Sequence, residues 1–183
     1  MEFFEKAHEI LTPILPKKFD ENEWFTIFAT ILVFWLFFFL HKRSRVLMKT
    51  EIIAILLFNL LYTTVGDYFL AMEPYDFYDT VDRNSAELMD VLLQNIVYPF
   101  TLLIFMNYYA KNKPNSLLFI LVGSGILFGL EWVGMKFFNL YTFKTWKSWY
   151  SLVFYIPVMY LNVIYYQKFH RYIHQQIKLN SLQ

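Results

Sequence analysis

Five long stretches of the chain lack Asp, Glu, Lys and Arg altogether, and they constrain the fold more than any other feature. They cover residues 24–40, 52–66, 91–110, 114–130 and 148–167. A bilayer core of about 30 Å needs roughly 20 apolar residues in a helix, and each stretch reaches or approaches that length once its flanks are added. The first reads WFTIFATILVFWLFFFL and is apolar on every helical face, whereas a soluble amphipathic helix keeps one polar side.

The sequence therefore predicts an all-α, polytopic membrane helical bundle that forms a single domain over residues 1–183. A soluble bundle would have to hide every side of at least three of these helices. Residues 1–20 carry apolar side chains at helical spacing, which suits either a short amphipathic helix on the membrane surface or a lid packed on the bundle. We expect about five transmembrane helices, near residues 24–40, 51–72, 88–110, 115–136 and 148–168.

Composition excludes several other classes of protein. The chain is 57% hydrophobic with a formal charge of only +1, which rules out disorder and gives no basic surface for nucleic acid. Without cysteine there is no disulfide, thiol nucleophile or cysteine zinc site. His170 and His174 lie one turn apart, but no nearby carboxylate completes a zinc site, and a solvated helix end explains them better. The sequence therefore predicts no metal site and no catalytic residue, and it identifies no cofactor.

The loops between the spans indicate an orientation. One side carries nine Lys and Arg residues and the other carries seven, and HKRSR lies directly against the end of the first span. Because positive charge close to a span favours the cytoplasmic side, we expect the N-terminus outside and the C-terminus in the cytoplasm of a plasma membrane.

Three carboxylates lie within the spans, and they define the candidate site. Asp67 is near the end of the second span, Asp90 near the start of the third and Glu131 near the end of the fourth. Since successive helices alternate in direction, all three ends lie on the same side of the membrane. A charge inside the membrane costs about 2.5–3.5 kcal/mol on insertion scales, so each carboxylate should face the bundle interior, a water-filled cavity or a cation.

Polar and aromatic residues extend this cluster. Glu87, Asp90 and Gln94 follow one another along a single helix face, and Trp146 and Trp149 suit either an aromatic belt or a lid over the carboxylates. The candidate ligand-binding residues are Asp67, Glu87, Asp90, Gln94, Glu131, Trp146 and Trp149. The alternative is that the carboxylates pair with Arg83, Lys136 or Lys144 and only fasten the helix ends.

Small and polar residues predict contacts between the helices. Gly125 and Gly129 form a small-xxx-small pair, which predicts close packing within the chain or, alternatively, a seam with a second copy or a partner membrane protein. Asn59 and Asn162 lie deep in their spans, where interhelical hydrogen bonds are expected. Pro99 removes a backbone donor and should kink the third span.

Part of the chain resembles a known group of proteins. Glu131-Trp132, the WKSWYS sequence at 146–151 and Tyr155 are similar to segments of small uncharacterised multi-pass membrane proteins of endospore-forming Bacillus- and Clostridium-type bacteria. Asp67-Tyr68 and the stretch from Asp90 to Tyr98-Pro99 extend the similarity over most of residues 50–165. The resemblance implies a bacterial plasma membrane and carries no established activity. It also suggests that the carboxylates and WKSWYS belong to one feature.

Three functions are compatible with these patterns. The first is a non-enzymatic membrane protein whose outward-facing acidic cavity binds a cation, small solute or lipid headgroup within a transport or signalling assembly. The second is an intramembrane enzyme on lipid-linked substrates with Asp90 or Glu131 as general base, although the sequence lacks a recognisable nucleophile. The third is a structural or partner-binding subunit. We favour the first, with membrane lipids as neighbours and no nucleic acid.

Overall fold

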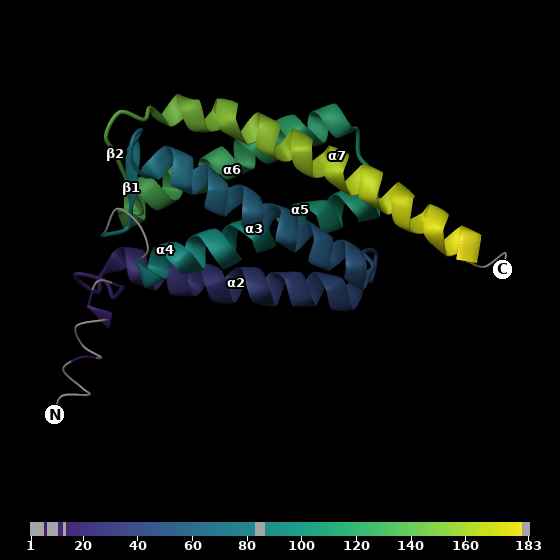
Figure 1. Ribbon diagram of the computed structural model, residues 1–183, viewed down its shortest axis with the longest axis horizontal. Coiled ribbons are helices and arrows are strands. Elements are labelled where there is room, and N and C mark those ends of the chain that lie inside the picture. Colours follow the sequence, from purple (N-terminus) through teal and green to yellow (C-terminus); the bar gives the residue numbers. More distant parts are fainter. Residues whose placement is uncertain (1–5, 7–10, 13, 83–86, 181–183) are drawn as a thin grey trace.

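The protein, seen in a computed structural model, is described over residues 6, 11–12, 14–82 and 87–180. Within this part, five long helices run alternately up and down beside one another (Figure 1). Four of them are α2 (Glu21–Arg43), α3 (Lys49–Ala71), α6 (Ser116–Phe138) and α7 (Ser148–Asn180). The other is one continuous helix made of three segments, α4 (Leu88–Leu92), η1 (Leu93–Val97) and α5 (Tyr98–Asn112). The predicted all-α membrane bundle is confirmed. The surface helix predicted within residues 1–20 falls mostly outside the described residues.

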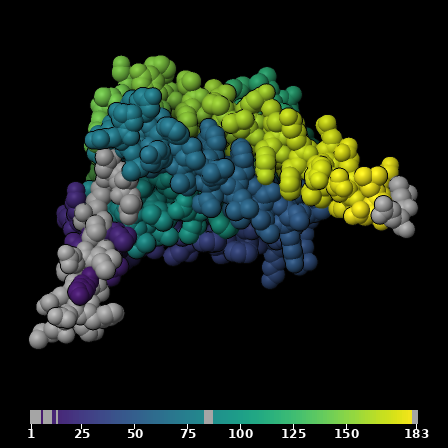
Figure 2. Space-filling model, in the orientation of Figure 1, coloured from purple at the N-terminus to yellow at the C-terminus, as the bar shows by residue number. Residues whose placement is uncertain are grey.

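Among the described residues, four helices are long and apolar enough to cross a membrane: α2, α3, Leu88–Asn112 and α6. The fifth predicted span forms the first part of α7, which packs along α6 but is richer in Tyr than the four spans above. The structure also extends α7 beyond the predicted end at residue 168, as far as Asn180. Figure 2 shows the C-terminal end of α7 projecting beyond the other helices.

The helix boundaries have local causes. At the start of α2, the Asp20 backbone N–H donates to Glu23 Oε2 at 2.6 Å, while the Asp20 side chain accepts from the Asn22 N–H at 3.4 Å. At the start of α6, Asn115 accepts from the Leu118 N–H at 3.1 Å. The helix ends at Asn139, whose φ of 47° is left-handed and stops further helical hydrogen bonding.

A two-stranded sheet covers one end of the bundle (Figure 1). Strand β1 (Tyr78–Thr80) follows α3, and the antiparallel strand β2 (Tyr141–Phe143) follows α6, so two connections far apart in sequence are joined. Lys144 strengthens the join with ion pairs of 2.8 Å to both Asp76 and Asp79. The sequence analysis did not predict this sheet, because strands of three residues carry almost no periodic pattern.

The helices close into a ring beneath the sheet. Helix α2 packs on α5, α5 on α3, α3 on α7 and α7 on α6, and α6 meets α2 again beside the sheet. That last contact includes stacked Phe25 and Phe138 rings, 4.4 Å between centroids, and a 2.6 Å hydrogen bond from Asn139 to Glu21. The arrangement leaves an interior space between the five helices.

The expected distortion at Pro99 takes the form of a π-helical turn. The chain widens over η1, directly before Pro99, so that the Tyr98 N–H donates to the Leu93 carbonyl five residues back. The neighbouring Gln94 carbonyl accepts a 2.9 Å hydrogen bond from the Thr63 hydroxyl of α3. The backbone irregularity is thus stabilised by a second helix.

The predicted pairing of Asn59 with another helix is confirmed. Its side-chain N–H donates to Asn162 Oδ1 at 2.8 Å, and Asn162 donates back to Asn59 Oδ1 at 3.0 Å. Both residues are buried, at 0% and 2% exposed, so the two amides satisfy each other between α3 and α7.

Replacing one member of this pair should destabilise the bundle. We expect Asn162→Leu to cost about 1–2 kcal/mol, because Asn59 then keeps a buried amide without its partner. The double variant Asn59→Leu/Asn162→Leu should cost less than either single change. Unfolding in increasing sodium dodecyl sulfate would measure all three variants, and equal losses for single and double variants would contradict the pairing.

The close approach between α6 and α7 occurs at Gly123, which the sequence offers beside the predicted pair, and not at Gly125 and Gly129 themselves. A Cβ at Gly123 would lie 2.4 Å from the Met159 methyl group, whereas one at Gly125 or Gly129 would meet nothing within 4 Å. The expectation of intrachain packing at the latter two glycines is therefore wrong, because they lie on a side of α6 that α7 does not cover.

This difference gives a paired test. Gly123→Val should destabilise the protein by about 1–3 kcal/mol, because the fully buried Met159 side chain would have to shift within packed surroundings. Gly125→Val should leave the stability nearly unchanged in the monomer. Thermal unfolding in detergent compares the two, and an equal loss in both variants would contradict the packing at Gly123.

Candidate functional site

A cavity of about 440 Å³ lies inside the helix ring, directly beneath the β1–β2 sheet. Side chains from every long helix and from both strands line it. Its end near the sheet is polar, with two carboxylates and several hydroxyl groups, and the remainder is aliphatic and aromatic. Two acidic groups thus share one cavity with an apolar chamber.

Glu131 anchors the polar end on the α6 side. The Ser151 hydroxyl donates to Glu131 Oε1 at 2.5 Å, and the Tyr155 hydroxyl donates to Oε2. The Trp146 indole N–H in turn donates to Ser151 Oγ at 2.8 Å. Glu131 therefore fixes Ser151 and Tyr155 directly and Trp146 through Ser151, and the first and last residues of WKSWYS, Trp146 and Ser151, are part of the cavity wall.

Asp67 lies on the α3 side of the same end. It accepts a 3.3 Å hydrogen bond from the Tyr78 hydroxyl. Gln94 also lines the cavity, and its Nε2 donates to Asp90 Oδ1 at 3.0 Å. The Gln94 amide thus connects the cavity lining to Asp90, which is only 4% exposed.

Two tyrosines of the sheet lie among these carboxylates. Burial raises the pKa of Tyr78 well above its ordinary value, and the nearby Asp67 and Glu131 carboxylates raise it further. Burial also raises the pKa of Tyr141, with added contributions from Asp90 and Asp67. Both hydroxyls therefore stay protonated at neutral pH, and that of Tyr78 donates to Asp67.

Within the described part of the chain, no Lys or Arg lies within 4 Å of Asp67 or Glu131. Lys144 is bound to the two aspartates of the sheet region, and the Lys136 ammonium lies 4.8 Å from the centre of the Trp132 ring. Neither lysine forms the predicted fastening of the helix ends, and Arg83 lies outside the described residues. The hydrogen bonds to these two carboxylates come from uncharged groups.

The apolar part of the cavity opens sideways between α2 and α6. Phe28 and Leu32 of α2 and Leu130 of α6 line the cavity, yet they are 63%, 41% and 52% exposed. The contacts between these two helices lie beside the sheet, at Phe25 and Phe138. Farther from the sheet, the cavity wall between α2 and α6 is therefore incomplete. This gap lies on an apolar outer face of the bundle, which would contact lipid.

The structure distributes the predicted site residues unevenly. Asp67, Gln94, Glu131 and Trp146 line the cavity, whereas Glu87 and Asp90 are buried outside its lining. Trp149 does not line it, is 59% exposed and packs edge-on against Tyr150, 4.3 Å between ring centroids, as a belt residue would.

Sequence reasoning did not identify the hydroxyl donors as site residues. Ser151 and Tyr155 entered the sequence analysis only as part of the resemblance to other membrane proteins. Their spacing of four residues nevertheless places both on one face of a helix. Tyr78 and Tyr141 depend on pairing between residues far apart in the chain, and no local pattern reveals that.

The apolar helices and the buried polar groups define the class of protein. It is an integral membrane protein built as a bundle of helices around an internal cavity. Comparison with known proteins adds no family to this class: no family model, curated protein or solved structure matches the chain.

Proposed function

We propose that this protein binds an amphipathic molecule of the membrane, with the ligand's positively charged headgroup at Asp67 and Glu131 and its hydrocarbon chain in the apolar chamber. The observation that carries the proposal is a single cavity with an acidic end and a side open toward lipid. A cation or a small polar solute would use only the acidic end. An amphipathic ligand uses both parts.

The Asp67 and Glu131 carboxylates can each accept further hydrogen bonds. An ionised carboxylate offers about four lone-pair positions. Glu131 uses two of them, for Ser151 and Tyr155, and Asp67 uses one, for Tyr78. Because these three donors are uncharged, an ammonium headgroup would add both further hydrogen bonds and the missing positive charge.

The side opening supplies a route for the chain. A ligand dissolved in the bilayer could pass between α2 and α6 without leaving the hydrocarbon region. Burial of apolar surface stabilises binding by about 0.8 kcal/mol per methylene relative to water, so affinity should rise with chain length until the chamber is filled.

We further propose a bacterial plasma membrane as the location, with the N-terminus outside and the C-terminus in the cytoplasm. The basic HKRSR segment at the end of α2 supports this orientation. The cavity would then lie in the outer half of the membrane, beneath a sheet that faces the exterior.

Matched amphiphiles test the proposed function. Dodecylamine and dodecanol share one chain and differ in headgroup, and each would be titrated into the purified protein in neutral detergent while the melting temperature is followed. Dodecylamine should raise it and dodecanol should raise it much less. Asp67→Asn and Glu131→Gln should each weaken the dodecylamine effect by about tenfold in half-saturating concentration, since each removes a charged acceptor.

Glu73→Gln is the matched control. Glu73 is an exposed carboxylate at the same end of the protein and does not line the cavity, so its loss changes the net charge equally. This variant should respond to dodecylamine as the parent does. An equal response to amine and alcohol in all proteins would overturn the acidic headgroup site, and the absence of stabilisation by either would overturn the lipid-like ligand.

A further inference from the structure

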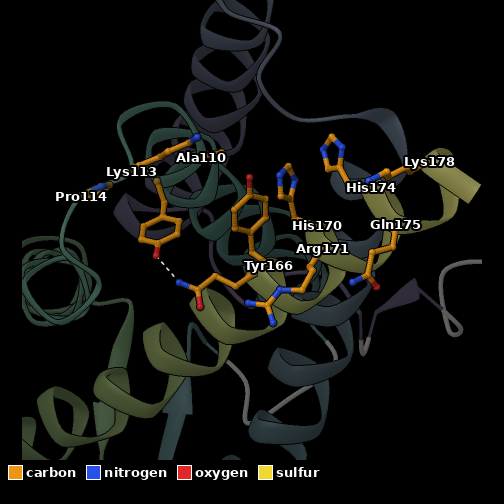
Figure 3. Close-up of a pocket in the computed structure, with 11 residues that line it drawn as sticks. Ala110, Lys113, Pro114, Tyr166, His170, Arg171, His174, Gln175 and Lys178 are labelled. Atoms are coloured by element: carbon orange, nitrogen blue, oxygen red, sulfur yellow. Dashed lines mark hydrogen bonds between the residues drawn. The ribbon is translucent and has the colours of Figure 1, made fainter.

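A second concave surface lies at the opposite end of the bundle, between α7 and the turn that joins α5 to α6. It has a volume of about 610 Å³, and the polar lining residues of α7 come from its last turns (Figure 3). Basic and potentially basic side chains dominate it: Lys113, His170, Arg171, His174 and Lys178. We call it the basic groove.

The carboxylate at this end of the bundle already has hydrogen-bond partners. Among all residues on this side, Glu51 is the single Asp or Glu, and it is fully buried. Its Oε1 lies 2.5 Å from His170 Nδ1, and its Oε2 accepts from the Met48 N–H at 2.8 Å. Nine Lys and Arg residues share the same side: Lys42, Arg43, Arg45, Lys49, Lys111, Lys113, Lys168, Arg171 and Lys178.

Lys113 lines the groove from the turn between α5 and α6, and Arg171 lines it from α7. Neither lies within 4 Å of an acidic group in the described part of the chain. The wall between them is held by uncharged hydrogen bonds, since Gln167 Nε2 donates to the Tyr109 hydroxyl at 2.6 Å and that hydroxyl pairs with Ser116 at 2.6 Å. A fixed polar wall therefore lies between two cations.

We propose that the basic groove binds the phosphate group of an anionic ligand, and that a membrane phospholipid supplies it. Arginine and lysine are the usual partners of phosphate oxygens. The groove lies where α5 ends and α6 begins, at the level expected for lipid headgroups, and α7 continues past that level. This site is separate from the acidic cavity and does not depend on the function proposed for it.

Lipid binding to charge-matched variants tests the proposal. The parent, Lys113→Gln/Arg171→Gln and Lys111→Gln/Lys168→Gln would be titrated in neutral detergent with dioleoylphosphatidylglycerol or dioleoylphosphatidylcholine, with native mass spectrometry and melting temperature as readouts. The control pair removes the same charge from the same two segments but lies outside the groove. Inorganic phosphate at millimolar concentration forms a third arm.

The parent should bind phosphatidylglycerol in preference to phosphatidylcholine. The groove variant should lose roughly 20- to 30-fold in affinity, because each basic residue near an anionic headgroup contributes about one kilocalorie per mole. The control should lose less than about threefold. Stabilisation of the parent by inorganic phosphate, abolished in the groove variant, would support phosphate recognition with a soluble source. Equal losses in both variants would overturn the site and leave only a general attraction, and unchanged binding in the groove variant would overturn it as well.

The substituted side chains are exposed or lie at the groove surface, so folding provides an independent check. All three proteins should share one melting temperature in the absence of lipid. Arg171→Lys, which retains the charge but loses the two-pronged geometry, should bind phosphatidylglycerol with an affinity between those of the parent and the groove variant.

Discussion

Glu131→Leu is expected to lower the free energy of unfolding by about 3 kcal/mol and to abolish dodecylamine binding. The substitution removes the acceptor of both Ser151 and Tyr155, and it leaves two hydroxyl donors without their partner in a largely apolar wall. Unfolding by sodium dodecyl sulfate and ligand-dependent melting would measure the two effects on the same samples.

A triple variant separates stability from binding. In Glu131→Leu/Ser151→Ala/Tyr155→Phe both hydroxyl donors are removed together with the acceptor, so only the half-buried Trp146 indole N–H loses its partner and most of the stability should return. Ligand binding should remain lost, because the carboxylate is absent. If the triple variant is as unstable as the single one, the hydrogen-bond network is not the origin of the loss.

Filling the apolar chamber should have the second large effect. Ala29 of α2 lines the cavity, and Ala29→Trp places an indole where we expect the ligand's hydrocarbon chain. Dodecylamine affinity should fall at least about tenfold, since a chain that loses two buried methylenes already loses about that much. Titrations followed by melting temperature, as for the carboxylate variants, provide the measurement.

Ile31→Trp is the control for this change. Ile31 lies two residues further along the same helix, is 62% exposed and does not line the cavity. It adds the same indole to the lipid-facing side of α2 and should leave dodecylamine affinity unchanged. If Ala29→Trp and Ile31→Trp bind equally well, the chain does not occupy the chamber.

The bundle could be predicted because its signal is local. A helix such as α2 has to satisfy its own backbone inside lipid, so an unbroken apolar run is enough to identify it. The alternation of five such runs then places the ends of α3, α4 and α6 together. The exact extent of α7 was less predictable, because the helix continues beyond the apolar span through the polar residues 169–180, where apolar character no longer indicates a helix.

The candidate site was only partly predictable because half of it is non-local. Asp67 and Glu131 are conspicuous in the sequence, since charge is rare within a span. Their partner Tyr78 belongs to a loop rich in aromatic residues, and only its pairing with β2 brings it to the cavity. Gly125 shows the opposite case, in which a local pattern predicted a contact that does not form. The small-residue pattern is present, but α7 packs against Gly123, two residues earlier.

The β1–β2 sheet has a consequence for the order in which the protein assembles. Strand β1 leaves the ribosome before α5 and α6, whereas β2 follows both. The sheet that covers the cavity therefore cannot form until β2, more than 60 residues after β1, has been synthesised. Until then Tyr78 is not held in position to donate its hydrogen bond to Asp67. The carboxylates therefore enter the membrane before all their hydrogen-bond partners are in place. The acidic cavity is thus among the last parts of the protein to exist, and a chain halted before α7 would hold its costly charges with no site around them.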